Sequence, residues 1–125
     1  MEPGGPLTID EFLTQQPSLT RTTRQKAEDF IETRLEMPLP VELLAKAAGM
    51  SCSHFTRAFR NAMKMPPHRY VMWRRLLRAQ ELLKNSNESL AEVALLTGFA
   101  DQSHLSRYFH LNLGESPSQF RRRHR

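Results

Sequence analysis

Two stretches of the chain carry the same polar side chains in the same order. Ser53 begins the run S-H-F-T-R-A-F, and Ser103 begins the run S-H-L-S-R-Y-F. Hydroxyl groups both donate and accept hydrogen bonds, and the guanidinium of an arginine can bind two acceptor atoms at once. Side chains of these kinds hydrogen-bond to the edges of DNA bases and to phosphate oxygens. The repeat therefore predicts two equivalent surfaces suited to nucleic acid.

Each run has the periodicity of a helix with one apolar and one polar face. The apolar face, which is expected to be core, carries Phe55, Ala58, Phe59, Ala62 and Met63 in the first copy, and Leu105, Tyr108, Phe109 and Leu113 in the second. The polar face carries Ser53, Thr56, Arg57 and Arg60 in the first copy, and Gln102, Ser103, Ser106, Arg107 and His110 in the second. A helix with such a polar face fits the major groove of DNA.

A short apolar helix precedes each of these segments and ends at a glycine. Gly49 and Gly98 can take the positive φ that closes a helix and turns the chain. A short helix, a turn and a second helix form a helix-turn-helix, so the sequence predicts two of them. The turns differ in length by one residue. Two copies are too few for a solenoid, and they indicate a pair of sister subdomains.

Three further helices are expected around the two pairs. An amphipathic helix at about 22–35 presents Ile31 to the core and leaves Glu32 in water. A long helix at about 68–84 joins the copies, and a last helix begins near Pro117. The joining helix, at 1.5 Å per residue, spans roughly 26 Å. Adjacent major-groove faces lie about 34 Å apart, so this length is compatible with two helices that enter successive grooves.

Charge divides the chain into two unequal parts. Residues 1–50 hold five lysines and arginines against eight acidic residues, whereas residues 51–125 hold thirteen against five. The basic C-terminal part indicates a polyanionic partner. A single cysteine excludes an internal disulfide and fits a reducing cytoplasm, and no apolar run is long enough to span a membrane. The sequence has no pattern typical of a catalytic, cofactor or metal site, so we do not expect an enzyme.

Three segments resemble the signature of a known family. The run G-F-A-D-Q-S-H-L-S-R-Y-F-H at 98–110, followed by G-E-S-P-S-Q-F-R at 114–121, resembles the signature of AraC/XylS transcription regulators, and G-M-S-C-S-H-F-T-R-A-F at 49–59 resembles their first helix-turn-helix. The resemblance covers residues 22–123. It implies an all-α fold of seven helices, in which two helix-turn-helix subdomains joined by a long linking helix read double-stranded DNA as a monomer.

On this basis the chain divides into four parts. Residues 1–20 are a flexible arm or interdomain linker, 21–65 the first helix-turn-helix subdomain, 66–84 the linking helix and 85–125 the second subdomain. Many family members also carry an effector-binding or dimerisation domain, which nothing in these 125 residues could form. The chain is either a short stand-alone regulator or the C-terminal part of a longer protein. Residues 1–20, which would suit an interdomain linker, favour the C-terminal part of a longer protein. The resemblance also implies a bacterial activator in the cytoplasm, at the nucleoid, with RNA polymerase subunits as further partners.

Position within the motif implies which side chains touch DNA. The expected base readers are Cys52, Ser53, Thr56 and Arg57 in the first copy, and Gln102, Ser103, His104, Ser106 and Arg107 in the second. The expected phosphate contacts are Arg60, Lys64, Arg74, Arg75, Arg78 and His110. Arginine pairs with guanine, and glutamine with adenine, through two hydrogen bonds. A local capping role for His104 is an equal alternative.

Two other interpretations stay open at this point. A basic helical adaptor would use the same surface to bind an acidic protein, and a non-specific DNA binder would contact phosphate without reading bases. The three interpretations differ in how binding depends on salt and on sequence. A sequence reader keeps its preference for particular duplexes at salt that removes non-specific binding, whereas an adaptor has no duplex preference.

Overall fold

The computed structural model describes Thr8 and residues 18–125, and it is helical without strands within them. The helices are α2 (Arg21–Glu32), α3 (Val41–Ala47), α4 (Cys52–Met63), α5 (Pro67–Asn85), α6 (Leu90–Leu96), α7 (Gln102–Leu113) and α8 (Pro117–Arg123). These seven helices confirm the expected fold class. The expected arm at 1–20 lies almost entirely outside the described residues. In the part that is described, no helix combines the length and the apolar character needed to cross a membrane.

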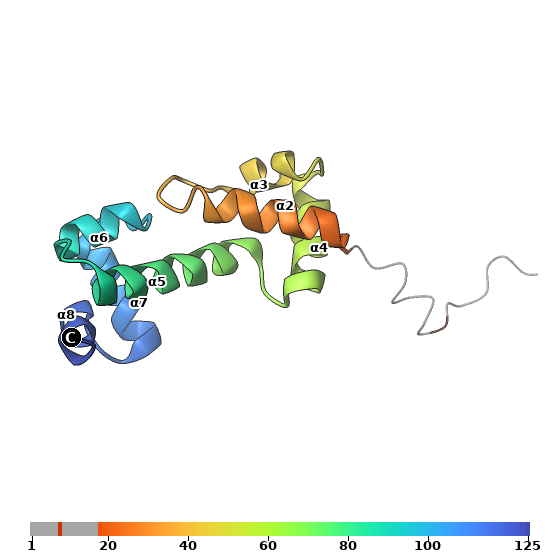
Figure 1. Cartoon of the computed structure of the whole chain (residues 1–125). Coiled ribbons are helices and arrows are strands. Elements are labelled where there is room, and N and C mark those ends of the chain that lie inside the picture. Colours follow the sequence, from red (N-terminus) through yellow and green to blue (C-terminus); the bar gives the residue numbers. More distant parts are fainter. Residues whose placement is uncertain (1–7, 9–17) are drawn as a thin grey trace, which may run out of the picture.

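The long helix α5 runs between two groups of helices (Figure 1). The first group, α2, α3 and α4, lies at its N-terminal end, and the second group, α6, α7 and α8, lies at its C-terminal end. With 19 residues, α5 is about 28 Å long at 1.5 Å per residue. The two matched helices, α4 and α7, therefore belong to different groups, and α5 sets how far apart they lie.

The two copies share the hydrogen bonds that end their first helices and begin their second helices, although the turns differ in length by one residue. Ser51 caps the N-terminus of α4 and Asp101 caps that of α7, because each side-chain oxygen accepts a hydrogen bond from the backbone N–H three residues on, at 3.2 and 2.8 Å. The preceding helices also end alike. Met50 and Phe99 each donate their backbone N–H to the carbonyl five residues back, at 2.9 Å in both copies. The sequence repeat is thus a repeat of local structure.

The C-terminal ends of α4 and α7 both take the left-handed conformation. Gly114 closes α7 at φ 73°, and Lys64 occupies the equivalent position after α4 at φ 63°. A residue with a Cβ atom is strained in this conformation, whereas glycine is not. Lys64 is exposed and belongs to the expected phosphate contacts, so the strain lies at the edge of the candidate site.

Each helix group has its own hydrophobic core, and α5 takes part in both. Tyr70 and Val71 of α5 pack in the first core, and Met72 and Leu76, next along the helix, pack in the second. The other buried residues of the first core are Leu19, Ala27, Ile31, Leu35, Leu39, Leu44, Ala45, Phe55, Ala58 and Phe59. Those of the second core are Ala79, Leu83, Val93, Ala94, Phe99, Leu105, Phe109 and Phe120. The change from one core to the other falls within a single turn of α5.

Phe59 and Phe109 hold matching places in the two cores. Both side chains are fully buried, as their periodicity predicts. The ring of Phe59 meets Tyr70 edge to face at 5.5 Å between centroids, and the ring of Phe109 meets Phe120 in the same way at 5.3 Å. Leu113 was expected on the same buried face as Phe109, and this prediction is wrong. It is 38% exposed because it is the final residue of α7, where the helix ends.

The two helix groups meet where the loop after α2 reaches the C-terminal end of α6 (Figure 1). Arg75 of α5 donates hydrogen bonds to two carbonyls of this loop, from Nε to Leu35 at 2.9 Å and from Nη2 to Met37 at 2.7 Å. Gly98, at the end of α6, lies so close that a Cβ atom there would collide with the Leu35 carbonyl and the Arg75 guanidinium. We call Arg75, Gly98 and the two carbonyls the inter-group joint.

Glu32 flanks the inter-group joint and binds two arginines of α5. Nε and Nη2 of Arg74 donate to its two carboxylate oxygens at 3.0 and 2.9 Å, and Nη2 of Arg78 donates to Oε1 at 2.9 Å. The hydrogen bond from Arg74 above all, together with that from Arg78, holds the pKa of Glu32 below its ordinary value, although partial burial acts in the opposite direction. The expectation that Glu32 simply faces water is corrected: its side chain is 35% exposed, and its carboxylate is paired with Arg74 and Arg78 of α5.

Replacing Phe109 by alanine removes a fully buried ring from the second core. The free energy of unfolding should fall by about 3–5 kcal/mol, because the substitution removes the contacts of the ring and also leaves a cavity. Denaturant titration followed by circular dichroism measures this change. Leu111→Ala, on the same helix at a side chain that is 80% exposed, is the matched control and should change the free energy by less than about 0.5 kcal/mol. Small and equal losses in both variants would show that the second core does not depend on this ring.

Candidate nucleic-acid interface

The first candidate surface is the outer side of α4. Cys52, Ser53 and Arg57 are exposed and Thr56 is half-buried, and the four side chains line one shallow hollow of about 560 Å³. Within the described residues, no three side chains of the types that hold metal ions come together, and the Cys52 thiol is free. The hollow brings together all four residues expected as base readers in the first copy. Arg57 is the only one of the four with a side chain long enough to reach well beyond the helix surface.

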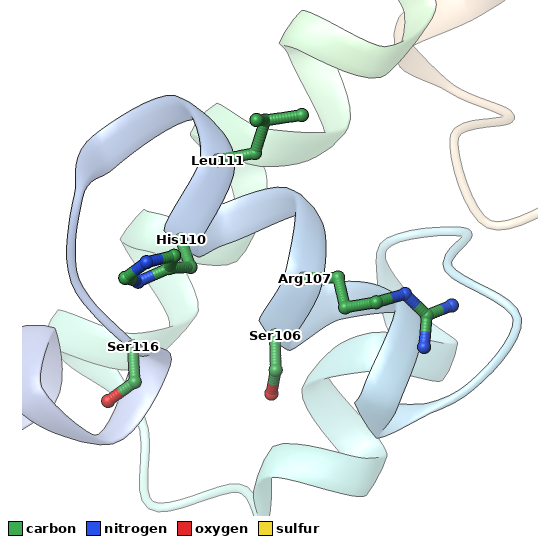
Figure 2. Close-up of a pocket in the computed structure, with 5 residues that line it drawn as sticks. All are labelled: Ser106, Arg107, His110, Leu111 and Ser116. Atoms are coloured by element: carbon green, nitrogen blue, oxygen red, sulfur yellow. The ribbon is translucent and has the colours of Figure 1, made fainter.

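The second candidate surface is the corresponding side of α7 (Figure 2). A hollow of about 580 Å³ is lined by Ser106, Arg107, His110, Leu111 and Ser116. The first three belong to the expected DNA contacts. Leu111 and Ser116 do not: Leu111 projects into solvent with 80% of its surface exposed, and Ser116 is the N-cap of α8. Leu111 stands four residues after Arg107 in the sequence, and residues at i and i+4 share a face of a helix. This spacing predicts that Leu111 lies beside Arg107.

The first turn of α7 carries the remaining expected readers of the second copy. Gln102 and Ser103 are exposed and lie outside the hollow. His104 is half-buried: its Nδ1 accepts a hydrogen bond from the backbone N–H of Ala100 at 3.2 Å, and its ring packs edge to face against Phe99 at 5.2 Å between centroids. His104 therefore braces the turn that leads into α7. Its Nδ1 is already used, which favours the local role over the reading of a base.

Cationic side chains at the two surfaces are unpaired. In the part of the chain that the structure describes, the side chains of Arg57, Arg60 and Lys64 near α4, and of Arg107 on α7, have no ion-pair or hydrogen-bonding partner. Arg121, by contrast, donates to three backbone carbonyls. Unpaired cations on an exposed helix attract a polyanion, because their charge is not offset by a neighbouring carboxylate.

The arginines of α5 are engaged within the protein. Arg74 and Arg78 are both bound to the Glu32 carboxylate, which offsets part of their charge. The hydrogen bond with Glu32 raises the pKa of Arg74 above its ordinary value. Phosphate contacts were expected at both arginines, and these ion pairs conflict with that expectation, since a contact with DNA would have to compete with Glu32.

Arg75 differs more strongly from its expected role. The residue is only 8% exposed, and burial lowers the pKa of its guanidinium. This burial corrects the expectation of a phosphate contact, because a guanidinium bonded to two carbonyls inside the protein cannot reach a DNA backbone. The signal was present in the sequence. Arg75 lies on the apolar stripe of α5, three residues after Met72 and four before Ala79.

Comparison with known proteins gives this geometry a context. The chain matches a model described as a helix-turn-helix domain over residues 44–123, which extend from α3 to α8. Over 117 residues it is 33% identical to the putative HTH-type transcriptional regulator YkgA of Escherichia coli K12, a match that covers 94% of this chain and 49% of that protein. The chain spans about half, or less, of the length of the first curated relatives it matches.

Solved structures have the same fold. An AraC-type transcriptional regulator from Chromobacterium violaceum superposes with a TM-score of 0.77 at 25% identity, over 83% of this chain and 93% of that one. The DNA-binding domain of AdpA, a global transcriptional factor solved in complex with a target DNA, gives a TM-score of 0.77 at 34% identity, over 81% and 91%. The fold and the two matched surfaces define a double helix-turn-helix DNA-binding module. The chain belongs to the AraC/XylS family of transcription regulators.

Replacing Arg60 by glutamine should reduce the slope of log affinity against log salt concentration by about 1, because one phosphate contact no longer releases a counterion. Arg74→Gln is the matched control and should leave the slope unchanged, since Arg74 is held by Glu32. Fluorescence anisotropy with a labelled mixed-sequence duplex, titrated between about 50 and 200 mM salt, measures both slopes. Equal reductions in the two variants would mean that Glu32 does not withdraw Arg74 from DNA.

Proposed function

We propose that this chain is the DNA-reading part of a bacterial transcription regulator, and that it inserts α4 and α7 into successive major grooves on one face of a duplex. One observation carries the proposal. Arg57 and Arg107 occupy equivalent places on the outer faces of the two matched helices, and both are exposed and unpaired within the described residues. The length of α5, about 28 Å, approaches the distance of about 34 Å between successive major-groove faces.

The proposed base-reading residues lie in the two hollows and in the first turn of α7. Arg57 and Arg107 each pair with a guanine, and Gln102 pairs with an adenine, through two hydrogen bonds. Single hydrogen bonds to bases come from Ser53, Thr56, Ser103 and Ser106. The phosphate contacts come from Arg60, Lys64 and His110, and they fix the register of the protein on the duplex without reading sequence.

The wider role follows from the relatives by analogy. AdpA is a global transcriptional factor whose domain was solved with a target DNA, and YkgA carries the name of a transcriptional regulator. By resemblance to the AraC/XylS family, we further propose that the chain acts in the bacterial cytoplasm, at the nucleoid, and activates transcription through contacts with RNA polymerase subunits. Because the chain spans 49% of the length of YkgA, the proposal includes an effector-binding or dimerisation domain in the whole protein.

Selection from a random duplex library at about physiological salt, followed by sequencing, tests the function. The expected product is an asymmetric site with two short blocks about 10 base pairs apart, one for each matched helix. A single block would mean that one copy reads bases while the other only contacts phosphate. A lack of enrichment in spite of binding would favour a non-specific binder, and a lack of binding would favour an adaptor for acidic proteins.

Replacing Arg107 by alanine should weaken binding to the selected site by about 1–3 kcal/mol and relax the preference at one base pair of the second block. The reason is the loss of a bidentate contact with guanine. Competition titrations with duplexes changed at each position in turn measure both effects. Arg24→Ala, at an arginine that pairs with Glu28 within α2, is the control and should alter neither. Unchanged affinity and preference in the Arg107 variant would exclude this side chain as a base reader.

Leu111 adds an apolar side chain to the second surface. It lines the same hollow as Arg107 and is 80% exposed, so it is open to a ligand (Figure 2). The apolar group that DNA presents in the major groove is the methyl of thymine. The proposal therefore assigns Leu111 to the methyl of a thymine next to the base that Arg107 reads.

Uracil lacks only this methyl, so it isolates the contact. Uracil in place of the critical thymine of the second block should weaken binding of the native protein by about 0.8 kcal/mol, the usual value of one buried methyl-sized group. Leu111→Ala should bind the thymine and uracil duplexes equally. Leu95→Ala, at a side chain of α6 that is 57% exposed, is the control and should keep the preference for thymine. A uracil effect of the same size in the native protein and in Leu111→Ala would exclude the contact.

A further inference from the structure

The inter-group joint ties together three segments that otherwise belong to separate helix groups. We propose that Arg75 is a positioning residue: it fixes the separation and the angle of α4 and α7, and thereby the number of base pairs that the protein accepts between the two blocks of its site. This inference rests on the proposed function, because it concerns how far apart the two reading helices lie on DNA. It adds to that function a determinant of spacing that makes no contact with DNA.

The Arg75 guanidinium has all its partners inside the protein. Nε and Nη2 donate to the carbonyls of Leu35 and Met37, and Nη1 lies 3.7 Å from the sulfur of Met72. In the described part of the chain no carboxylate forms an ion pair with it. A buried cation without hydrogen bonds is strongly unfavourable. Moving the loop after α2 away from α5 would therefore break both of these hydrogen bonds.

The end of α6 packs against this same guanidinium. Gly98 has φ +84°, and the space where a Cβ atom would lie is filled by the Leu35 carbonyl and by Nε and Cζ of Arg75. Gly49, its equivalent in the first copy, has open space at that point. The close approach thus belongs to the contact between the groups and is not required by the helix-turn-helix itself. Since α7 follows α6 through a short turn, the position of α6 fixes that of α7.

Glu32 forms a brace that limits rotation of the first helix group about α5. Glu32 ties α2 to two points of α5 that are four residues apart, Arg74 and Arg78, while Arg75 holds the loop that follows α2. Residues four apart lie one turn above each other on a helix, so the carboxylate spans a full turn of α5. Two attachments on neighbouring turns resist both sliding and twisting of the first group against the helix. The two reading helices are held as one unit.

A rigid arrangement has a direct consequence for DNA. One additional base pair between the two blocks moves the second block by about 3.4 Å and turns it by about 34° about the duplex axis. A rigid pair of helices cannot follow this change, so the protein rejects the altered spacing. With a loosened joint, the protein would adopt the binding-competent arrangement of α4 and α7 for a smaller fraction of the time, and its affinity at the selected spacing would fall by that fraction. The same protein would fit duplexes with one base pair more or fewer more easily.

The test uses duplexes that carry the two selected blocks at the selected spacing and at one base pair more or fewer. The native protein should prefer the selected spacing by about 10-fold or more. Arg75→Met, which keeps a long side chain but removes the donors, should bind that duplex about 3–10-fold more weakly and discriminate among the three spacings by less than about 3-fold. Binding to a duplex with only one block should be unchanged, because each reading helix is intact. Arg75→Lys keeps the charge but has fewer hydrogen-bond donors. Its affinity and its discrimination among spacings should lie between those of the native protein and of Arg75→Met.

Arg24→Met is the control, since Arg24 pairs only within α2, and it should keep the native preference for spacing. A thermal melt checks that Arg75→Met is folded; if it is not, Glu32→Gln weakens the brace and is judged by the same criterion. A folded variant that keeps the native discrimination overturns the proposal. Native protein that binds all three spacings equally also overturns it and leaves the proposed function intact. If the native protein selects no two-block site, the proposed function fails, and this inference fails with it.

Discussion

A cation inside a protein must keep its hydrogen-bonding partners, and the partners of Arg75 belong to a different helix group from the one it packs beside. Met72 and Leu76, its neighbours on α5, lie in the second core, whereas the carbonyls of Leu35 and Met37 follow the last turn of α2. Hydrophobic packing alone would build two cores on a common helix and leave their relative orientation to the stiffness of that helix. The buried charge adds a directional restraint, because hydrogen bonds weaken steeply with angle as well as distance.

The sequence carried the parts of the fold that depend on local spacing. Phe59 and Phe109 recur at helical intervals among other apolar residues, so their burial could be predicted, and the glycines after α3 and α6 marked both turns. Contacts across the chain could not be predicted in this way. Glu32 finds its arginines more than 40 residues away, and no periodicity within α2 distinguishes a carboxylate in water from one in an ion pair. The role of Arg75 could not be predicted for the same reason. The sequence shows its place on the apolar stripe of α5, but it does not show which distant carbonyls the guanidinium binds.

The candidate site shows the same division. The exposed helix faces followed from the repeat, and the hollows on α4 and α7 gather most of the residues that those faces predicted. Leu111 was overlooked because an apolar residue on a polar face contradicts the pattern that defines the face. Net charge was a coarser guide still. Several of the arginines that make the C-terminal part basic serve the structure, as Arg75 and Arg121 do, so the number of cations free to meet DNA is smaller than composition suggests.

The left-handed residue that closes α4 has a consequence for how the two copies divide stability and binding. Lysine in this conformation costs about 1 kcal/mol relative to the glycine that closes α7. In return, the first copy holds a flexible ammonium group at the end of its reading helix, where the second copy has no side chain at all. The first reading helix is therefore fastened less firmly at its end, and it carries more of the attraction to phosphate. The two copies therefore share their architecture but differ in balance: the first has the more charged surface, and the second has the less strained helix end.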